Sequence, residues 1–289
     1  MVELTQSRIE KWITEEATGV FHYTKVLDGQ VPPKLFNQLR AIMHKCKTKS
    51  IAYPVSGKDG WWRAADNTLE ELLWWDSGEI EDDNLILPLD LHNYCVIPRP
   101  SLVIIAGKYN AGKTAFCLNT VKLNEPKWGG YLDLYVSEGA EMMREKFARL
   151  GVIGVPSFRT WRRTQNFADI INPDNLSIID YLRVDMTQSY AVTEKLFEIF
   201  NKLKTGIAVV AMQKPPGERK LAFGGASTAF EPSLYIGMES TSANSGWVGF
   251  EKIKITRNYG AVDPYTMKVH YKLRHGVEFW DVHNKIGEL

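Results

Sequence analysis

The chain has 289 residues, 44% of them hydrophobic and 24% charged, and its formal net charge is +1. These values are typical of an ordinary globular protein with one large domain, or with one large and one small domain. They exclude a protein whose whole surface attracts nucleic acid or membrane by its charge, so any basic surface has to be local. The three cysteines lie far apart, which favours neither a disulfide framework nor a zinc site. The sequence has no run of about 18 apolar residues and no secretory signal, so we expect a cytoplasmic protein without a transmembrane helix.

The first 65 residues predict a small module of three helices followed by a β-hairpin. Thr5 or Ser7 can cap the first helix, and Pro32-Pro33 suits the first turn of the third. Apolar residues recur at helical spacing in both. We expect helices over about residues 5–17, 21–27 and from residue 32 onward, and strands over residues 50–55 and 61–64 joined by a turn.

This order of elements resembles the winged-helix family, an α+β fold. The resemblance implies DNA binding, with the third helix in the major groove and the hairpin as the wing. Phosphate contacts need cations, and several lie on or just after the third helix or at the tip of the hairpin: Lys34, Arg40, Lys45, Lys47, Lys49 and Lys58. The alternative is a winged helix that contacts protein, with these side chains as a solvated surface.

The rest of the chain predicts a linker over residues 66–100 and a larger domain over residues 101–289. The linker contains an acidic stretch at residues 79–83 and three prolines, Pro88, Pro98 and Pro100. Beyond it, apolar runs of strand length alternate with helical patterns. This alternation predicts an α/β domain with a mostly parallel sheet and helices on both faces.

Residues 107–114 read Gly-Lys-Tyr-Asn-Ala-Gly-Lys-Thr and fit the pattern G-x-x-x-x-G-K-[ST] of nucleotide-phosphate loops. The apolar run before the loop predicts a strand, and the residues after it predict a helix. Loop N–H groups and a helix N-terminus bind anionic oxygens, while the lysine reaches the phosphates and the threonine hydroxyl binds Mg²⁺. The sequence therefore predicts a site for ATP and Mg²⁺, with nucleotide contacts from Gly107, Asn110, Ala111, Gly112, Lys113, Thr114 and Ala115.

Two further predicted strands end in acidic residues. The predicted strand over residues 176–182 carries Asp180 near its end. This aspartate lies about 65 residues beyond the phosphate loop, which suits the aspartate that holds Mg²⁺ in such sites. Residues 131–138 end in Glu138 and precede a predicted helix over residues 140–150. This arrangement resembles the RecA and DnaB-type ATPases, in which a glutamate at this place polarises the attacking water. Glu138 is our candidate base, and Glu141, in a Glu-Met pair similar to a DnaB motif, is the alternative.

A fourth buried strand, over residues 206–214, ends in Gln213 and Lys214. In the families that the chain resembles, a glutamine at this place senses the γ-phosphate, which implies that role for Gln213. The loop that follows contacts DNA in RecA-like proteins. By this resemblance Lys214, Arg219 and Lys220 are candidate phosphate contacts, although an ordinary surface loop explains them equally well.

Residues 251–260 resemble the K-x-R-N-G strand of DnaB-type helicases, which offers basic side chains to the ATP of a neighbouring subunit. Arg257-Asn258 fits that motif, Ile255 stands where the family has lysine, and Tyr259 separates the Asn-Gly pair. The resemblance implies that Arg257 acts in trans on the transition state. A strand with solvent-facing lysines is the alternative.

Together these features identify the chain as similar to RecA/DnaB-type P-loop ATPases, with a winged helix in place of the helical domain of DnaB. The fusion suggests a protein of a phage or another mobile element. We expect a Mg²⁺-dependent ATPase that binds DNA as a ring or filament of identical subunits, in replication, recombination or transposition, with a possible partner protein of those pathways. Two alternatives stay open: a nucleotide-gated binding module with slow hydrolysis, and a small-molecule kinase.

Overall fold

The computed structural model describes residues 4–66, 71, 73–76, 78–81, 84–182, 189–217, 220–257 and 263–286. The chain divides into two compact units, Met1–Ser77 and Gly78–Leu289, and each unit has its own hydrophobic core. Among the described residues, no helix has both the length and the apolar character that crossing a bilayer requires.

The first unit packs two helices on a three-stranded antiparallel sheet of order β1-β3-β2. Thr5 caps the first helix, because its hydroxyl accepts a hydrogen bond from the N–H of Arg8. The apolar faces of both helices meet the aromatic side chains of the strands, and Trp12 lies edge-on against Phe21 with ring centroids 5.3 Å apart. The elements are α1 (Gln6–Glu15), β1 (Val20–His22), α2 (Phe36–Thr48), β2 (Ala52–Pro54) and β3 (Trp61–Ala64).

The helix that we predicted over residues 21–27 is wrong. Residues Val20–His22 form a strand instead, because they pair with Trp61–Arg63 of the hairpin, and only 3₁₀ turns follow at Tyr23–Gly29. The third predicted helix is present, but its first turn, Pro33–Leu35, is 3₁₀ and the α-helix begins at Phe36. The hairpin of β2 and β3 agrees with the prediction.

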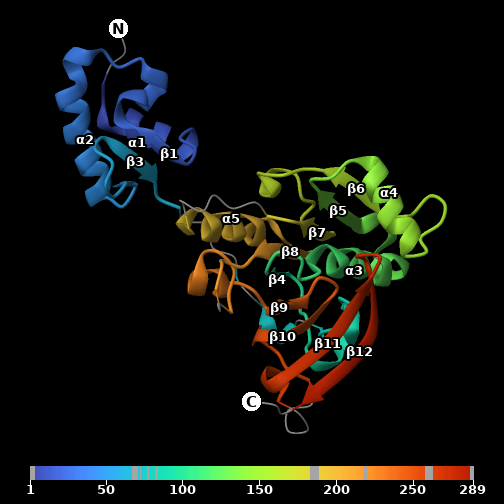
Figure 1. Cartoon of the computed structure of the whole chain (residues 1–289). Coiled ribbons are helices and arrows are strands. Elements are labelled where there is room, and N and C mark those ends of the chain that lie inside the picture. The colour runs from blue at the N-terminus through green and yellow to red at the C-terminus, as the bar shows by residue number, and fades with distance from the viewer. Residues whose placement is uncertain are drawn as a thin grey trace. The chain divides into compact units, whose positions relative to one another are not determined.

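The second unit is an α/β domain built on a nine-stranded sheet of order β12-β11-β10-β9-β4-β8-β7-β5-β6 (Figure 1). The six strands from β9 to β6 are parallel, and their crossover connections carry the helices. These parallel strands and helices are β4 (Ser101–Gly107), α3 (Lys113–Trp128), β5 (Leu132–Val136), α4 (Ala140–Arg149), β6 (Arg159–Arg162), β7 (Leu176–Asp180), α5 (Ser189–Lys202), β8 (Ile207–Gln213) and β9 (Leu234–Ser242).

Helices cover both faces of the parallel strands, as expected for strands that are buried on two sides. On one face α3 and α4 pack on the sheet through Phe116, Val121 and Phe147, and on the other face α5 packs through Leu196 and Ile199. The sheet between them is apolar throughout its centre, and β4 and β7 are buried along their whole length.

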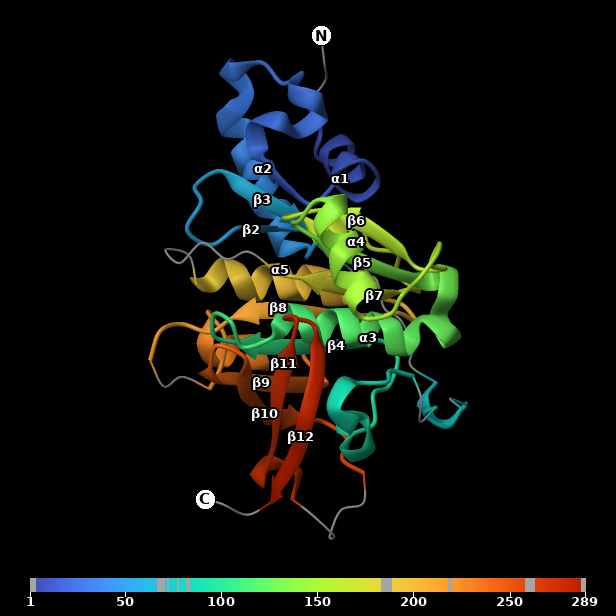
Figure 2. The same ribbon diagram turned by 45° about the vertical axis from the view of Figure 1, so that its right-hand side comes forward.

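The C-terminal part of the sheet is antiparallel, which differs from the strand and helix alternation that we expected to residue 289. Here β10 (Ser245–Ile253), β11 (Met267–Arg274) and β12 (Glu278–Ile286) follow β9 through turns, and no α-helix intervenes among the described residues. Figure 2 shows β11 and β12 as the long red hairpin at the edge of the sheet. The strand that we predicted to reach residue 260 ends at Ile253, and residues 258–260 lie outside the described part of the chain.

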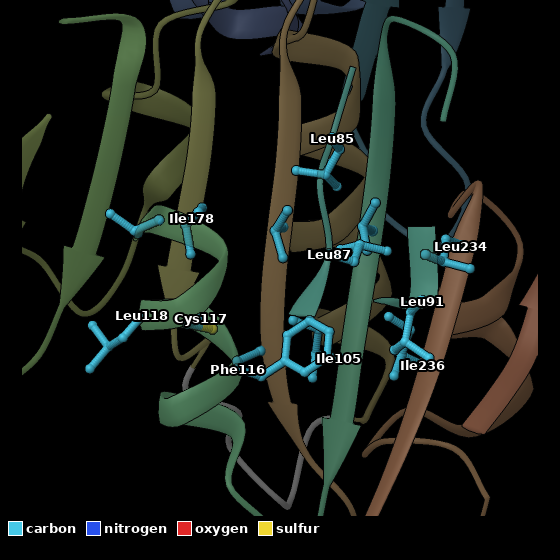
Figure 3. Packing of buried hydrophobic residues seen from close by; sticks show 14 of the residues in the cluster. Leu85, Leu87, Leu91, Ile105, Phe116, Cys117, Leu118, Ile178, Leu234 and Ile236 are labelled. Carbon is cyan, nitrogen blue, oxygen red and sulfur yellow. The ribbon is translucent and has the colours of Figure 1, made fainter. Parts of the chain in front are cut away.

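Much of the predicted linker belongs to the second unit. Leu85, Leu87 and Leu91 are buried in its core, and Figure 3 shows Leu87 and Leu91 among side chains from the sheet, including Ile105 and Ile236. Asn124 of α3 fixes this segment, since its side chain bonds both the N–H and the carbonyl of residue 86. The prolines and acidic residues of this segment indicated a linker, but its apolar side chains pack in the core of the domain.

Candidate functional site

Lys113, Asp180 and Gln213, three of the predicted site residues, lie together at the carboxyl edge of the parallel sheet. Gln213, the last residue of β8, is paired in register with Gly107, the last residue of β4. Asp180 ends β7 and is paired with Val136 of β5, two residues before Glu138. Because the ends of parallel strands meet at one edge, residues up to about 100 positions apart in sequence come together here.

The glycines of the loop between β4 and α3 allow a tight turn around an open space. Gly112 has φ +84°, a conformation that other residues adopt only with strain, and an added Cβ would lie 3.1 Å from Leu273. An added Cβ at Gly107 would lie 3.1–3.2 Å from Lys113, Ala111 and Met238. Helix α3 begins at Lys113 with no side-chain cap, so its first N–H groups stay directed at the loop.

The ammonium of Lys113 is held inside this loop by three oxygen atoms. Its Nζ donates to the carbonyls of Gly107 at 2.9 Å and Lys108 at 2.8 Å, and to Oε1 of Gln213 at 3.1 Å. Burial lowers the pKa of Lys113 to about 8, and the charge of Asp180 opposes that fall only in part. The site therefore contains a desolvated cation that an incoming anion would stabilise.

Asp180 lies beside the first turn of α3 and is only 8% exposed. Burial raises the pKa of its carboxyl group, and a hydrogen bond with the Thr114 side chain acts in the opposite direction. A hydroxyl and a carboxylate in contact at the edge of a phosphate loop are hard oxygen donors of the kind that Mg²⁺ prefers. No cluster of three or more His, Cys, Asp or Glu side chains suited to a metal occurs among the described residues.

A cavity of about 480 Å³ opens at the loop, and segments that sequence analysis did not assign form one of its walls. The β9–β10 turn contributes Ala243 and Asn244, and the β11–β12 hairpin contributes Leu273 and Gly276. The phenol of Tyr271 ties this hairpin to the loop, since it donates to the carbonyl of residue 111 at 2.6 Å. Only the antiparallel register brings these residues to the loop. The remaining lining residues are Tyr109, Asn110, Ala111, Gly112, Lys113, Thr114, Ala115, Asp180, Tyr181 and Gln213.

Glu138 lies just beyond β5, and a lysine that we did not predict binds it. The Nζ of Lys146, two turns into α4, donates to Oε1 and Oε2 of Glu138 at 2.7 and 2.6 Å. The charge of Glu138 contributes to the raised pKa of Asp180, which sets the two carboxylates near each other. Glu141, the alternative base, is exposed in the first turn of α4.

The prediction that Lys214 is a surface contact for DNA is wrong for this conformation. Its side chain is 1% exposed and lies between two carboxylates, at 3.0 Å from Glu239 and 3.9 Å from Glu251. Glu239 also pairs with Lys108 of the phosphate loop at 3.0 Å. Burial opposes ionisation of Glu239, but hydrogen bonds from the two lysines hold its pKa below the ordinary value. Lys220 is exposed, and Arg219 lies outside the described residues.

Arg257 lies at the opposite edge of the sheet from the phosphate loop. Strand β10 is antiparallel to β9, so its last residue, Ile253, pairs with the first residue of β9, Leu234. Beyond this point Arg257 donates from Nε to the carbonyl of Cys95 at 3.0 Å, and its N–H bonds the carbonyl of Tyr94 at 3.1 Å. The structure therefore does not bring Arg257 to the phosphate loop of its own chain.

In the first unit, α2 and the hairpin carry an exposed basic surface. No Asp or Glu occurs between Asp28 and Asp59. The guanidinium of Arg40 stacks over the ring of Tyr23 at 4.8 Å, and Lys49 pairs with Glu10 at 2.8 Å. The other cations of this surface, all exposed, are Lys34, Lys45, Lys47 and Lys58.

A comparison with models of protein families and a search of curated proteins find no match for this chain. Its function must therefore be argued from the site itself.

Proposed function

We propose that the chain is a Mg²⁺-dependent ATPase of the RecA/DnaB type that acts on DNA as an oligomer of identical subunits. The observation that carries the proposal is the desolvated ammonium of Lys113, held by the loop carbonyls and Gln213 next to the buried carboxylate of Asp180. A lysine in such a loop gains an anionic partner when phosphates bind, and this gain supports nucleotide binding.

The residues at the edge of the sheet suit distinct roles in phosphoryl transfer. Lys113 would neutralise the β- and γ-phosphates, and Gln213, already hydrogen-bonded to Lys113, would respond to the γ-phosphate. Thr114 and Asp180 would hold Mg²⁺ through hard oxygen donors. The metal would supply charge neutralisation at the transferred phosphoryl group.

The base would be Glu138, with Glu141 as its alternative. In the structure Lys146 binds both carboxylate oxygens of Glu138, so this pair must open before Glu138 accepts a proton from water. The same contact favours a second candidate function, a nucleotide-gated switch in which hydrolysis is slow because its base is engaged. The two functions differ in the turnover rate and in its response to DNA.

The position of Arg257 supports the proposal of an oligomer. If this arginine contacts a nucleotide, it would do so in a neighbouring subunit, as the arginine of the K-x-R-N-G motif does in DnaB-type helicases. We propose that Arg257 leaves the Cys95 carbonyl to take that role. The first unit would bind duplex DNA, because its basic surface surrounds the helix and hairpin that a winged helix uses.

Steady-state ATPase measurements test the proposal directly. The rate is measured with no DNA, with single-stranded DNA and with duplex DNA, at fixed salt and at several protein concentrations. We expect turnover that rises with DNA and increases more than linearly with protein, because sites are shared between subunits. Lys113→Ala should abolish turnover, whereas the exposed Lys204→Ala, a matched loss of one lysine, should not.

A slow rate that DNA does not alter would favour the nucleotide-gated switch over the DNA-stimulated ATPase. Unchanged turnover in Lys113→Ala would remove the nucleotide site from this loop.

A further inference from the structure

The antiparallel hairpin at the edge of the second unit has two chemically different faces. In β11, Met267, Val269 and Tyr271 are buried against the core. The alternate positions face outward and carry three cations and one histidine, which form a basic stripe along β11, one of the two red strands of the hairpin in Figure 2. This stripe consists of Lys268, His270, Lys272 and Arg274.

Two tryptophans flank this stripe on the neighbouring strands. Trp247 of β10 is the register partner of His270, and Trp280 of β12 is the partner of Lys272. Lys268 lies 4.9 Å from the ring centroid of Trp247, and Lys272 and Arg274 lie 5.2 and 5.0 Å from that of Trp280. Trp280 is 40% exposed, so part of its ring is accessible from outside.

A groove of about 660 Å³ continues this face toward the phosphate loop. Gly249 lines it, and an added Cβ there would lie 3.0 Å from the carbonyl of residue 267, so a larger residue fits this position poorly. The carboxylates of Glu239 and Glu251 are occupied by the buried Lys214. The cations left at the rim of the groove are Lys220 and Lys268.

We propose that this face, the outward side of β10, β11 and β12 with the adjoining groove, is a binding platform for single-stranded nucleic acid. Single strands are recognised by cations that follow the phosphates and aromatic rings that stack on unpaired bases. Here the cations stand at alternate residues of β11, and the two tryptophans lie on the strands beside it. A duplex hides the faces of its bases, so the tryptophans would gain nothing from it.

Charge also argues for this occupant. Two acidic side chains of β12 form exposed ion pairs with cations of β11. Asp281 pairs with Lys272 at 2.6 Å, and Glu278 pairs with Arg274 at 3.7 Å. Exposed ion pairs contribute little stability, so a phosphate group can replace the carboxylate at either cation. The platform is separate from the basic surface of the first unit, and it goes beyond the proposed function by giving the ATPase unit its own strand-binding site.

The test uses the full chain and three variants of the platform. Trp280→Leu removes stacking and keeps apolar bulk, Trp280→Phe keeps an aromatic ring, and a double variant, Lys268→Ala with Lys272→Ala, removes two cations. A charge-matched control, Lys202→Ala with Lys204→Ala, removes two exposed lysines at the end of α5. Affinity for labelled oligo-dT and oligo-U is measured by fluorescence anisotropy at several salt concentrations.

We expect Trp280→Leu to weaken oligonucleotide binding about tenfold, as loss of stacking on one base does, and Trp280→Phe to retain most of the affinity. The double lysine variant should lower the slope of log K against log salt by about 1.4, since each single-strand phosphate contact contributes about 0.7. The control should keep both values, and all variants should keep the ATPase rate measured without nucleic acid.

Affinities of Trp280→Leu and the double variant equal to those of the control would overturn the proposal. A changed oligomeric state with unchanged oligonucleotide affinity would also overturn it, in favour of a subunit interface. Because binding is measured without turnover, a chain that binds oligonucleotide yet hydrolyses no ATP refutes only the proposed ATPase.

Discussion

The buried charge of Lys113 predicts an unusual pH dependence of stability. Folding lowers the pKa of this lysine from 10.5 to about 8, because burial disfavours the ammonium form. Between these two values the unfolded chain binds more protons than the folded chain, so this residue makes the free energy of unfolding rise with pH. Below pH 8 the ammonium costs the folded state about 3 kcal/mol, and about 2 kcal/mol of this cost is recovered between pH 7 and pH 10.

Lys113→Met isolates this contribution, because every other lysine and tyrosine titrates in both proteins. The free energy of unfolding is measured for each by urea titration at pH 7, 8, 9 and 10. We expect the difference, wild type minus variant, to rise by about 2 kcal/mol across this range. The exposed Lys204→Met serves as the control, and its difference from wild type should stay constant.

Saturating Mg·ATP should abolish the rise, because bound phosphates stabilise the ammonium form. If the free energies of unfolding of wild type and Lys113→Met change in parallel with pH, the lysine is not desolvated. The argument for an anion site at this ammonium would then fail.

Three further predictions concern single contacts. Tyr271→Phe removes the phenol that donates to the Ala111 carbonyl and should lower the free energy of unfolding by about 1–3 kcal/mol, measured by urea titration, with unchanged stability arguing against this tie. Lys146→Met frees Glu138 and should raise single-turnover ATP hydrolysis, whereas an unchanged rate would favour the alternative base. Arg257→Ala should bind ATP yet hydrolyse it slowly, and mixing it with Glu138→Ala protein should restore activity if the arginine acts in trans.

The parallel half of the fold could be predicted because local sequence patterns indicate its strands and helices. Apolar runs of strand length, such as residues 102–106 and 207–212, have one stable placement, which is a buried parallel strand between helices. The antiparallel half could not be predicted, because β10 and β11 show the same alternation that a loop-flanked edge strand would show. Their register depends on pairs such as Trp247 with His270, which are distant contacts.

The candidate site divides in the same way. The phosphate-loop residues are consecutive, so their glycine spacing predicts them, and Asp180 and Gln213 follow because each ends a buried strand. Tyr271 and Lys146 have no such signal. A tyrosine in a strand and a lysine in a helix are ordinary in sequence, and only the fold brings them to Ala111 and Glu138.

Lys113 and Lys214 show why residue type alone misassigns function at this edge of the sheet. Both lysines lie near the carboxyl ends of β4 and β8, yet Lys214 is neutralised by the carboxylates of Glu239 and Glu251, whereas Lys113 bonds two carbonyls and a neutral amide. A buried cation paired with two carboxylates gains little from a further anion, whereas Lys113 forms its hydrogen bonds with neutral oxygens and receives only partial compensation from the charge of Asp180, so it gains more. Glu239 pairs with Lys214 and also with Lys108, so it connects Lys214 to the loop that contains Lys113. A bound phosphate group would therefore be attracted to Lys113 rather than to Lys214.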